Sequence, residues 1–274
     1  MTEMAPRTIA RYQTDASLRE LVTRVISCQP LSTLAENERA LFKTAPDDDY
    51  VVATSETIFH PQGGGQPSDT GTMKSDNNKE ITFEVKMARK LSNGQILHAG
   101  SFISQADDKQ IFSEGETVVQ AVDNDKRDYH SRLHTAGHLI GLAVRQLADS
   151  IPNVSELKAN HAPGSSFVEF QGLIGGEHKD AIQQKVTDMV MQSLPVNVCW
   201  WDERKVRECC TGVPDAVTVP DDGLMRVVEV QGVGAYPCGG THLPTTYDIG
   251  EVVVRKISRQ KGISKISYEV KERQ

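Results

Sequence analysis

The sequence lacks several features that define whole classes of protein. Nowhere in its 274 residues does an uninterrupted apolar run reach the length of about 18 residues that a transmembrane helix needs. The N-terminal segment has no apolar stretch of the kind found in secretory signals, and Glu3 disfavours a mitochondrial presequence. We therefore expect a cytoplasmic protein with no membrane partner.

Cysteine and positive charge are also limited. The five cysteines are odd in number and irregularly spaced, which argues against a disulfide framework. The formal net charge of −7 is unsuited to indiscriminate coating of nucleic acid. Basic residues gather from Glu251 onward, where the net charge is +4. That run is either a solvated strand face or a local contact for nucleic acid.

The first 125 residues favour β structure. We predict a helix over Ser17–Ile26, and short alternating segments predict strands at 8–12, 50–59, 81–86, 95–98 and 117–123. The segment from His60 to Gly71 holds three successive glycines between prolines, so its backbone needs unusual φ values or a close approach. The pattern predicts a β-rich, barrel-like domain at 1–125.

From about residue 126 the periodicity changes. Apolar residues between Tyr129 and Ala148 recur at helical spacing over about five turns. Further helices are predicted at 177–194 and 202–210, and strands at 166–171, 196–201, 224–230, 250–257 and 263–270. This order predicts an α+β domain at 126–274 with a largely antiparallel sheet, and hence an α+β protein overall.

Two groups of residues suit a metal ion. His130, His134 and His138 are spaced by four on the predicted long helix, so they share one face. Cys238 and His242 flank a Gly-Gly turn. Two of the helical histidines with this pair would form a tetrahedral site of three nitrogens and one sulfur, which suits one Zn²⁺ better than Mg²⁺ or Ca²⁺. Because four protein ligands fill a tetrahedron, catalysis needs a displaced ligand or a fifth position.

Two catalytic motifs are absent. A zinc peptidase of the His-Glu-x-x-His type needs a glutamate where Thr135 stands. No Gly-Lys-Ser/Thr follows the glycine-rich loop, so the loop is not a nucleotide-binding P-loop and no nucleotide cofactor is expected.

With these residues in view, the chain resembles the AlaX family, the free-standing relatives of the editing domain of alanyl-tRNA synthetase, which has a counterpart in threonyl-tRNA synthetase. The resemblance covers residues 8–270. It rests on the glycine-rich segment 59–71, on Arg132-Leu-His-Thr-Ala-Gly-His-Leu139, on Pro237-Cys-Gly-Gly-Thr-His242 and on the basic strand segment 261–268. Gly137 stands where a threonine is common in the family. With its glycine-rich loop, the chain resembles the medium-length members of the family.

The resemblance implies a cytoplasmic, ATP-independent hydrolase that removes serine, and sometimes glycine, from mischarged tRNA(Ala). It implies that His134, His138, Cys238 and His242 hold zinc. It also implies that the glycine-rich loop serves editing or tRNA placement. The residues that we expect to contact tRNA or substrate are Gly63, Gly64, Gly65, Gln66, Arg255, Lys261 and Lys265.

We expect zinc to orient the aminoacyl group or to activate a water, with Thr241 first and Thr135 second as contacts for substrate or water. Local turn or helix bonding is the alternative for both hydroxyls. Two other functions remain open. One is editing of Ser-tRNA(Thr), and the other is a non-catalytic RNA-binding module whose zinc only staples two elements together.

Overall fold

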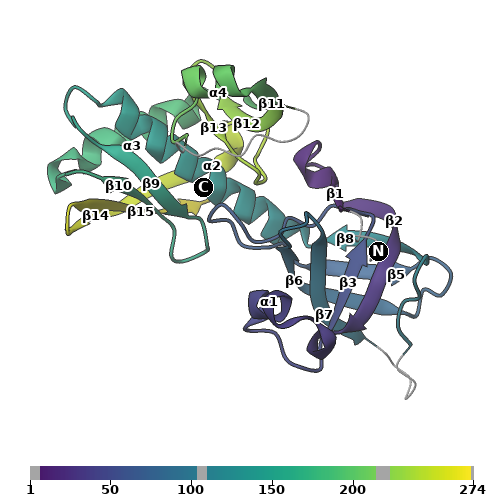
Figure 1. The fold of residues 1–274 in the computed structure, drawn as a ribbon. Helices are drawn as coiled ribbons and strands as arrows, with labels where there is room; N and C mark the ends of the chain where they lie inside the picture. The colour runs from purple at the N-terminus through teal and green to yellow at the C-terminus, as the bar shows by residue number, and fades with distance from the viewer. Residues whose placement is uncertain (1–6, 104–109, 214–222, 273–274) are drawn as a thin grey trace. The chain divides into compact units, whose positions relative to one another are not determined.

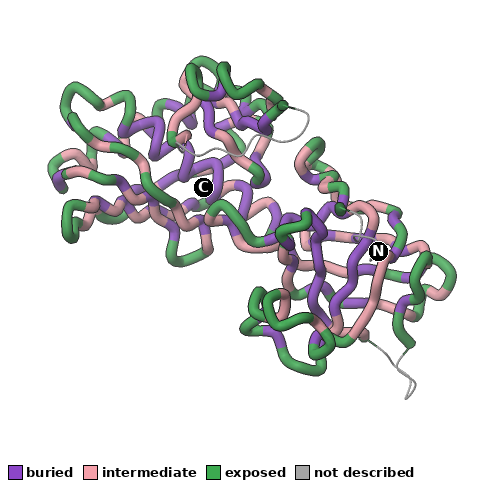
Figure 2. Tube along the Cα trace, viewed as in Figure 1, coloured by how far each residue is buried: buried purple, intermediate pink, exposed green. Residues whose placement is uncertain are grey.

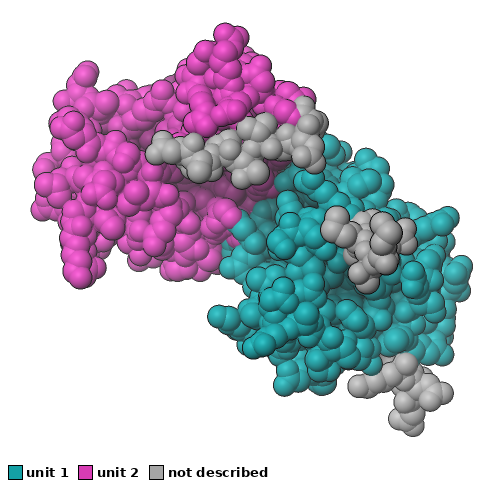
Figure 3. Space-filling model, in the orientation of Figure 1, with its two compact units in different colours: residues 1–63, 67–127 teal, residues 64–66, 128–274 magenta. Residues whose placement is uncertain are grey.

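The computed structural model describes residues 7–103, 110–213 and 223–272. The chain divides into two compact units, drawn in different colours in Figure 3. The first comprises residues 1–63 and 67–127, and the second comprises residues 64–66 and 128–274. The short segment Gly64–Gln66 therefore belongs with the second unit, although its neighbours on both sides belong with the first. The predicted domains 1–125 and 126–274 stay a prediction.

The first unit is built on a closed six-stranded barrel with strand order β2-β3-β7-β6-β5-β8 (Figure 1). Its strands are β2 (Glu20–Pro30), β3 (Tyr50–Thr54), β5 (Gly71–Ser75), β6 (Thr82–Lys90), β7 (Ile96–Ile103) and β8 (Thr117–Val122). Neighbouring strands all pair antiparallel. Outside the barrel, β1 (Ile9–Ala10) pairs with β4 (Glu56–Thr57), and α1 spans Glu36–Arg39. The barrel confirms the β-rich N-terminal fold.

The predicted helix over Ser17–Ile26 is wrong, because this segment forms most of β2. Strand β2 pairs with β8 along its first half and with β3 along its second half. Val22, Thr23, Val25 and Ile26 are β-branched, so they suit a pleated surface better than a helix. Barrel closure needs this strand to join β3 to β8.

The second unit is an α+β structure with two antiparallel sheets, as predicted for the fold class. A four-stranded sheet has the order β14-β15-β10-β9, and a three-stranded sheet has the order β11-β12-β13. The strands are β9 (Ser155–Asn160), β10 (Phe167–Gln171), β11 (Val196–Asp202), β12 (Leu224–Val230), β13 (Gly234–Pro237), β14 (Glu251–Gln260) and β15 (Ile263–Lys271). The helices are α2 (Asn124–Gln146), α3 (Lys179–Met191) and α4 (Glu203–Cys209).

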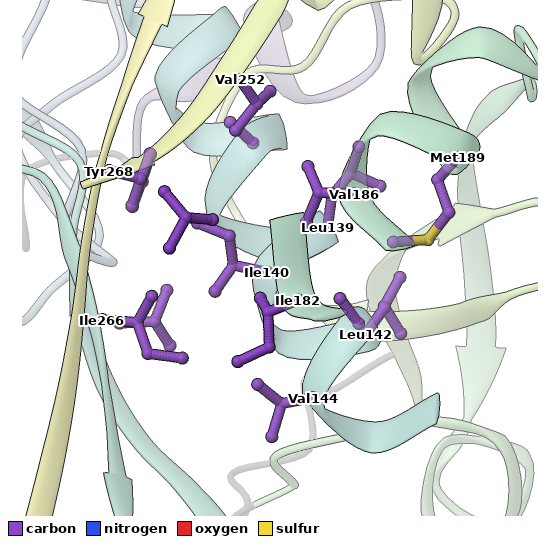
Figure 4. Packing of buried hydrophobic residues seen from close by; sticks show 14 of the residues in the cluster. Leu139, Ile140, Leu142, Val144, Ile182, Val186, Met189, Val252, Ile266 and Tyr268 are labelled. Carbon is purple, nitrogen blue, oxygen red and sulfur yellow. The ribbon is translucent and has the colours of Figure 1, made fainter. Parts of the chain in front are cut away.

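Helix α2 organises the core of the second unit. It begins five residues before the predicted start, and the Asp123 carboxylate accepts a hydrogen bond from the Lys126 backbone N–H at 3.1 Å, as an N-cap does. Its apolar stripe packs against α3 and the inner face of the four-stranded sheet, and Figure 4 shows Ile140, Ile182 and Ile266 meeting there. Figure 2 shows that α2 is buried over most of its length. No helix in the described part of the chain is long and apolar enough to span a bilayer.

Candidate metal centre

Four potential metal ligands converge from two elements of the second unit. His134 and His138 lie one turn apart on α2, and Cys238 and His242 lie in the loop that follows β13. The ligand atoms of these four residues all lie within 4.8 Å of one another. Cys238 Sγ is 3.5 Å from His134 Nε2 and 3.3 Å from His242 Nε2. The structure thus brings together residues that are about 100 positions apart in the sequence.

These separations fit a tetrahedral zinc site. Bonds of about 2.0–2.1 Å to nitrogen and about 2.3 Å to sulfur place the sulfur and a nitrogen of a tetrahedral site about 3.5–3.6 Å apart. Cys238 Sγ lies at this distance from His134 Nε2, and it lies slightly closer to His242 Nε2. His130, also buried on α2, is not among the four residues of the cluster.

The electrostatics of the cluster also suit a cation. Burial lowers the pKa of His138 to about 3, so its ring is neutral, as a metal ligand must be. Burial raises the pKa of the Cys238 thiol, although the Gly240 backbone N–H and Arg226 partly oppose the shift. A thiolate at this buried position therefore needs further positive charge beside it, which a bound metal cation would supply.

Hydrogen bonds determine which ring nitrogen of His242 carries the hydrogen and which has the lone pair. The Thr135 hydroxyl donates to the Ser131 carbonyl oxygen at 2.8 Å. Its only hydrogen is then used, so it must accept the hydrogen of His242 Nδ1, which lies 3.1 Å away. The lone pair of His242 is therefore on Nε2, the atom nearest to Cys238 Sγ.

Thr241 lies in the loop between Cys238 and His242 and faces α2. Its side chain is fully buried, and its Oγ1 lies 2.7 Å from Ser131 Oγ and 2.8 Å from Gln66 Nε2. The two threonines singled out from the sequence therefore both lie beside the cluster, and both take part in its hydrogen bonds.

His161, which sequence reasoning missed, packs on one of the candidate metal ligands, His134. Its ring stacks on that of His134, with centroids 4.3 Å apart and an interplanar angle of 23°. Tyr268 Oη lies 2.6 Å from His161 Nδ1 and donates to the Leu133 carbonyl oxygen at 2.9 Å. Gly137 makes room for this pair, because a Cβ there would lie 2.3 Å from His161 Cε1. A lone histidine in a strand–loop segment carries no motif, so the sequence offered no signal for it.

The buried pair of Tyr236 and Glu156 is a second feature that the sequence did not reveal. The Tyr236 ring packs on His138 with centroids 4.4 Å apart, and its hydroxyl donates to Glu156 Oε2 at 2.9 Å. Burial raises the pKa of Glu156 to about 7, although the bond from Tyr236 partly opposes the shift. Glu156 and Gly141 line a cavity of about 720 Å³ that also borders the C-terminal part of α2.

The predicted tRNA-contact residues occupy several places. Gly63 and Gly64 are exposed, and Gly65 is half-buried. Lys261 is in the turn between β14 and β15 with a φ of 50°. Arg255 pairs with Glu269 at 2.9 Å, and Lys265 lies over the Phe167 ring at 3.5 Å. The described contacts of these last two residues are thus with the four-stranded sheet.

The fold and the ligand cluster define an α+β protein with a candidate metal centre. Comparison with known proteins identifies the family to which it belongs. Residues 225–267 match the family model of the threonyl and alanyl tRNA synthetase second additional domain. The alanine--tRNA ligase of Thermotoga petrophila is 31% identical over 232 residues, which are 84% of this chain and 25% of the ligase. The chain thus spans about a quarter of the length of that ligase.

Free-standing proteins match over a larger share of their length. The alanyl-tRNA editing protein AlaX-M of Methanosarcina barkeri is 30% identical over 218 residues, which cover 78% of this chain and 85% of that protein. The AlaX-L protein of Pyrococcus horikoshii is 25% identical over 264 residues, which cover 94% of this chain and 56% of that protein. The chain belongs to the AlaX family of alanyl-tRNA editing proteins.

Proposed function

We propose that the protein is a trans-editing hydrolase that deacylates mischarged tRNA(Ala), chiefly Ser-tRNA(Ala) and also Gly-tRNA(Ala), at a site holding one Zn²⁺. The observation that carries the proposal is the cluster of His134, His138, Cys238 and His242, whose ligand atoms all lie within 4.8 Å of one another, in a member of the AlaX family. The named activity of the relatives AlaX-M and AlaX-L, alanyl-tRNA editing, gives the substrate class.

A second, hydrolytic site is needed because binding alone cannot discriminate strongly enough between similar amino acids. A synthetase pocket sized for alanine gains only about 1–3 kcal/mol against a substrate that differs by one small group, so serine and glycine are charged by error. A site that hydrogen-bonds the serine hydroxyl rejects alanine, because its buried polar groups would stay unpaired. The buried hydroxyls beside the cluster, Thr241 and Thr135, are our candidates for contacts with substrate or water. Thr135 could only accept in such a contact, because its hydrogen is used by the Ser131 carbonyl oxygen.

The metal, when bound, supplies Lewis-acid chemistry toward the ester carbonyl or a water. The chain's own residues hold and orient it. His134, His138, Cys238 and His242 provide the donor atoms, and Thr135 fixes the ring of His242. Thr241 is tied to α2 through Ser131, so a substrate contact by its hydroxyl keeps a fixed position relative to the ligands.

For tRNA we propose a contact on the basic end of the four-stranded sheet. Lys265, Arg259 and Lys158 line an open groove of about 620 Å³ with Glu169 at its side. Lys261 is next to it in the β14–β15 turn, and Arg255 lies further along β14. Phosphate groups fit such cations, and a small number of contacts is consistent with the net charge of −7. We expect Lys265→Ala and Lys261→Ala to lower the affinity for tRNA and to make that affinity less dependent on salt. Lys74→Ala, which changes an exposed lysine of the barrel, is the control and should leave the affinity unchanged.

The test is deacylation of Ser-tRNA(Ala), Gly-tRNA(Ala), Ala-tRNA(Ala) and Ser-tRNA(Thr) by the zinc-loaded protein. We expect rapid loss of serine from tRNA(Ala) and slow loss of alanine. His138→Ala should lower the rate at least about 100-fold while circular dichroism shows an intact fold. Faster hydrolysis of Ser-tRNA(Thr) would instead assign the protein to threonyl-tRNA editing.

One observation favours a second candidate, an RNA-binding module with a purely structural metal. Four protein donors complete a tetrahedron, as in structural zinc sites. This candidate requires stoichiometric zinc, tRNA binding and no hydrolysis of any of the four esters, and it requires that loss of one ligand unfolds the second unit. Hydrolysis abolished in a folded ligand variant contradicts it.

A further inference from the structure

The glycine-rich loop sends one buried side chain to the metal cluster. Gln66 is 0% exposed and belongs to the second compact unit. Its Oε1 lies 2.7 Å from His134 Nδ1 and accepts from the Thr241 backbone N–H at 3.0 Å, while its Nε2 donates to Thr241 Oγ1 at 2.8 Å. One amide thus contacts a metal-binding histidine and the residue that precedes another, His242.

These contacts leave only one arrangement of hydrogens. The backbone N–H of Thr241 can only donate, so the amide atom facing it must be the oxygen of Gln66. The same oxygen faces His134 Nδ1, so that nitrogen must carry the hydrogen. The lone pair of His134 is therefore on Nε2, which lies 3.5 Å from Cys238 Sγ.

We infer that Gln66 is a positioning residue for the metal site: it holds His134 in the tautomer and orientation that direct Nε2 to the metal, and it fixes Thr241 at the same time. The inference rests on the metal site of the proposed function. Groups that accept the second N–H of a metal-binding histidine typically set the ring's orientation and its basicity.

Two glycines from different motifs make this placement possible. Gly65 has a φ of 79°, and a Cβ there would lie 2.4 Å from the Ala159 carbonyl oxygen. Its own carbonyl accepts from the His161 backbone N–H at 2.8 Å, which fastens the loop beside β9. A Cβ at Gly240 would lie 2.4 Å from His134 Nδ1 and 2.6 Å from Gln66 Oε1. The glycines thus leave the space that the amide and the imidazole fill.

This role differs from the one the sequence suggested. The loop was expected to contact tRNA or substrate through Gly63, Gly64, Gly65 and Gln66. In the structure the side chain of Gln66 has both ends of its amide occupied by protein groups, so it works through His134 and Thr241. The exposed Gly63 and Gly64 stay free to serve the predicted tRNA contact.

The test compares Gln66→Leu, which removes the acceptor, with Gln66→Glu, which keeps an oxygen toward His134 and Thr241. Gln62→Leu is the matched control, because Gln62 is exposed on the same loop. Zinc affinity is measured by competition with a chromophoric chelator, and the site is also monitored by the absorption spectrum of the cobalt-substituted protein. We expect Gln66→Leu to lower zinc affinity about 10–100-fold and to alter the cobalt spectrum. Gln66→Glu and Gln62→Leu should stay within about threefold of the wild type.

A second measurement needs no variant. Long-range proton–nitrogen NMR of the metal-free protein reports which ring nitrogen of His134 holds hydrogen, and we expect Nδ1. Hydrogen on Nε2, or wild-type zinc affinity in folded Gln66→Leu, overturns the inference. Equal loss of affinity in Gln66→Leu and Gln66→Glu also overturns it, because a general packing role predicts that result. Absence of zinc binding by the wild type would instead reject the proposed metal site.

Discussion

The ring of His161 lies flat on that of His134, with the ring centroids 4.3 Å apart. Space for this stack comes from Gly137, where a Cβ would approach His161 Cε1 to 2.3 Å and Tyr268 Oη to 2.8 Å. The glycine at position 137 therefore has a steric reason in this chain. A side chain at residue 137 and the observed positions of His161 and Tyr268 exclude one another.

Gly137→Ala tests this exclusion. In a free helix the change is stabilising by about 1 kcal/mol. Here we expect it to destabilise the protein by about 1–3 kcal/mol, because the added methyl group forces buried rings to move. Urea denaturation of the single variant and of Gly137→Ala with His161→Ala measures the coupling. The loss should shrink when His161 is absent, and strictly additive losses would contradict the steric explanation.

Metal removal should destabilise the wild type and leave a ligand variant unaffected. A ligand present at about 1,000 times its dissociation constant stabilises the folded state by about 4 kcal/mol, or roughly 10 °C in Tm. We expect that difference between zinc-loaded and chelator-treated wild type, and no difference for Cys238→Ala. Cys209→Ala changes an exposed cysteine and should behave as the wild type does. A chelator effect of equal size in Cys238→Ala would place the metal elsewhere.

Glu156 should make stability depend on pH. Its pKa rises from 4.5 to about 7 on folding, mainly through burial. The folded state therefore favours the protonated acid, and this contribution is complete below about pH 4.5 and lost as the pH rises through about 7. Glu156→Gln mimics the neutral acid, so it should exceed the wild type in stability above neutral pH by up to about 3 kcal/mol.

The check is the difference in unfolding free energy between wild type and Glu156→Gln, measured by urea denaturation from about pH 5 to about pH 8. Contributions of the histidines cancel in this difference. A difference that does not change over this range would show that Glu156 ionises in the fold as readily as in the unfolded chain.

The first unit contains a buried ion pair, and breaking it should lower the free energy of unfolding. Arg127 and Asp69 are each 1% exposed at the side chain, and Arg127 Nε lies 3.0 Å from both carboxylate oxygens. Asp69→Ala leaves the guanidinium buried without its partner charge, so we expect a loss of about 3–5 kcal/mol. The exposed pair Lys126–Asp123 offers a contrast, since Lys126→Ala should cost less than about 1 kcal/mol in the same denaturation experiment.

Local patterns predicted the elements whose signals are local. The helical spacing of apolar residues identified α2, and the four-residue spacing on it placed His134 and His138 on one face. The long-range contacts could not be predicted from the sequence. Gln66 is 68 residues from His134, and His161 meets Tyr268 across 107 residues, so neither contact has a periodicity that a sequence displays. The wrong helix over Ser17–Ile26 has a different cause, because the β-branched residues of this segment already favoured the strand that pairs with β3 and β8.

The assignment of Gly64–Gln66 to the second compact unit bears on how this protein can be divided. A fragment that starts at Asp128 would carry all four candidate metal ligands and yet lack the amide that faces His134. Cutting the chain at its apparent boundary therefore separates the metal site from one of its own parts.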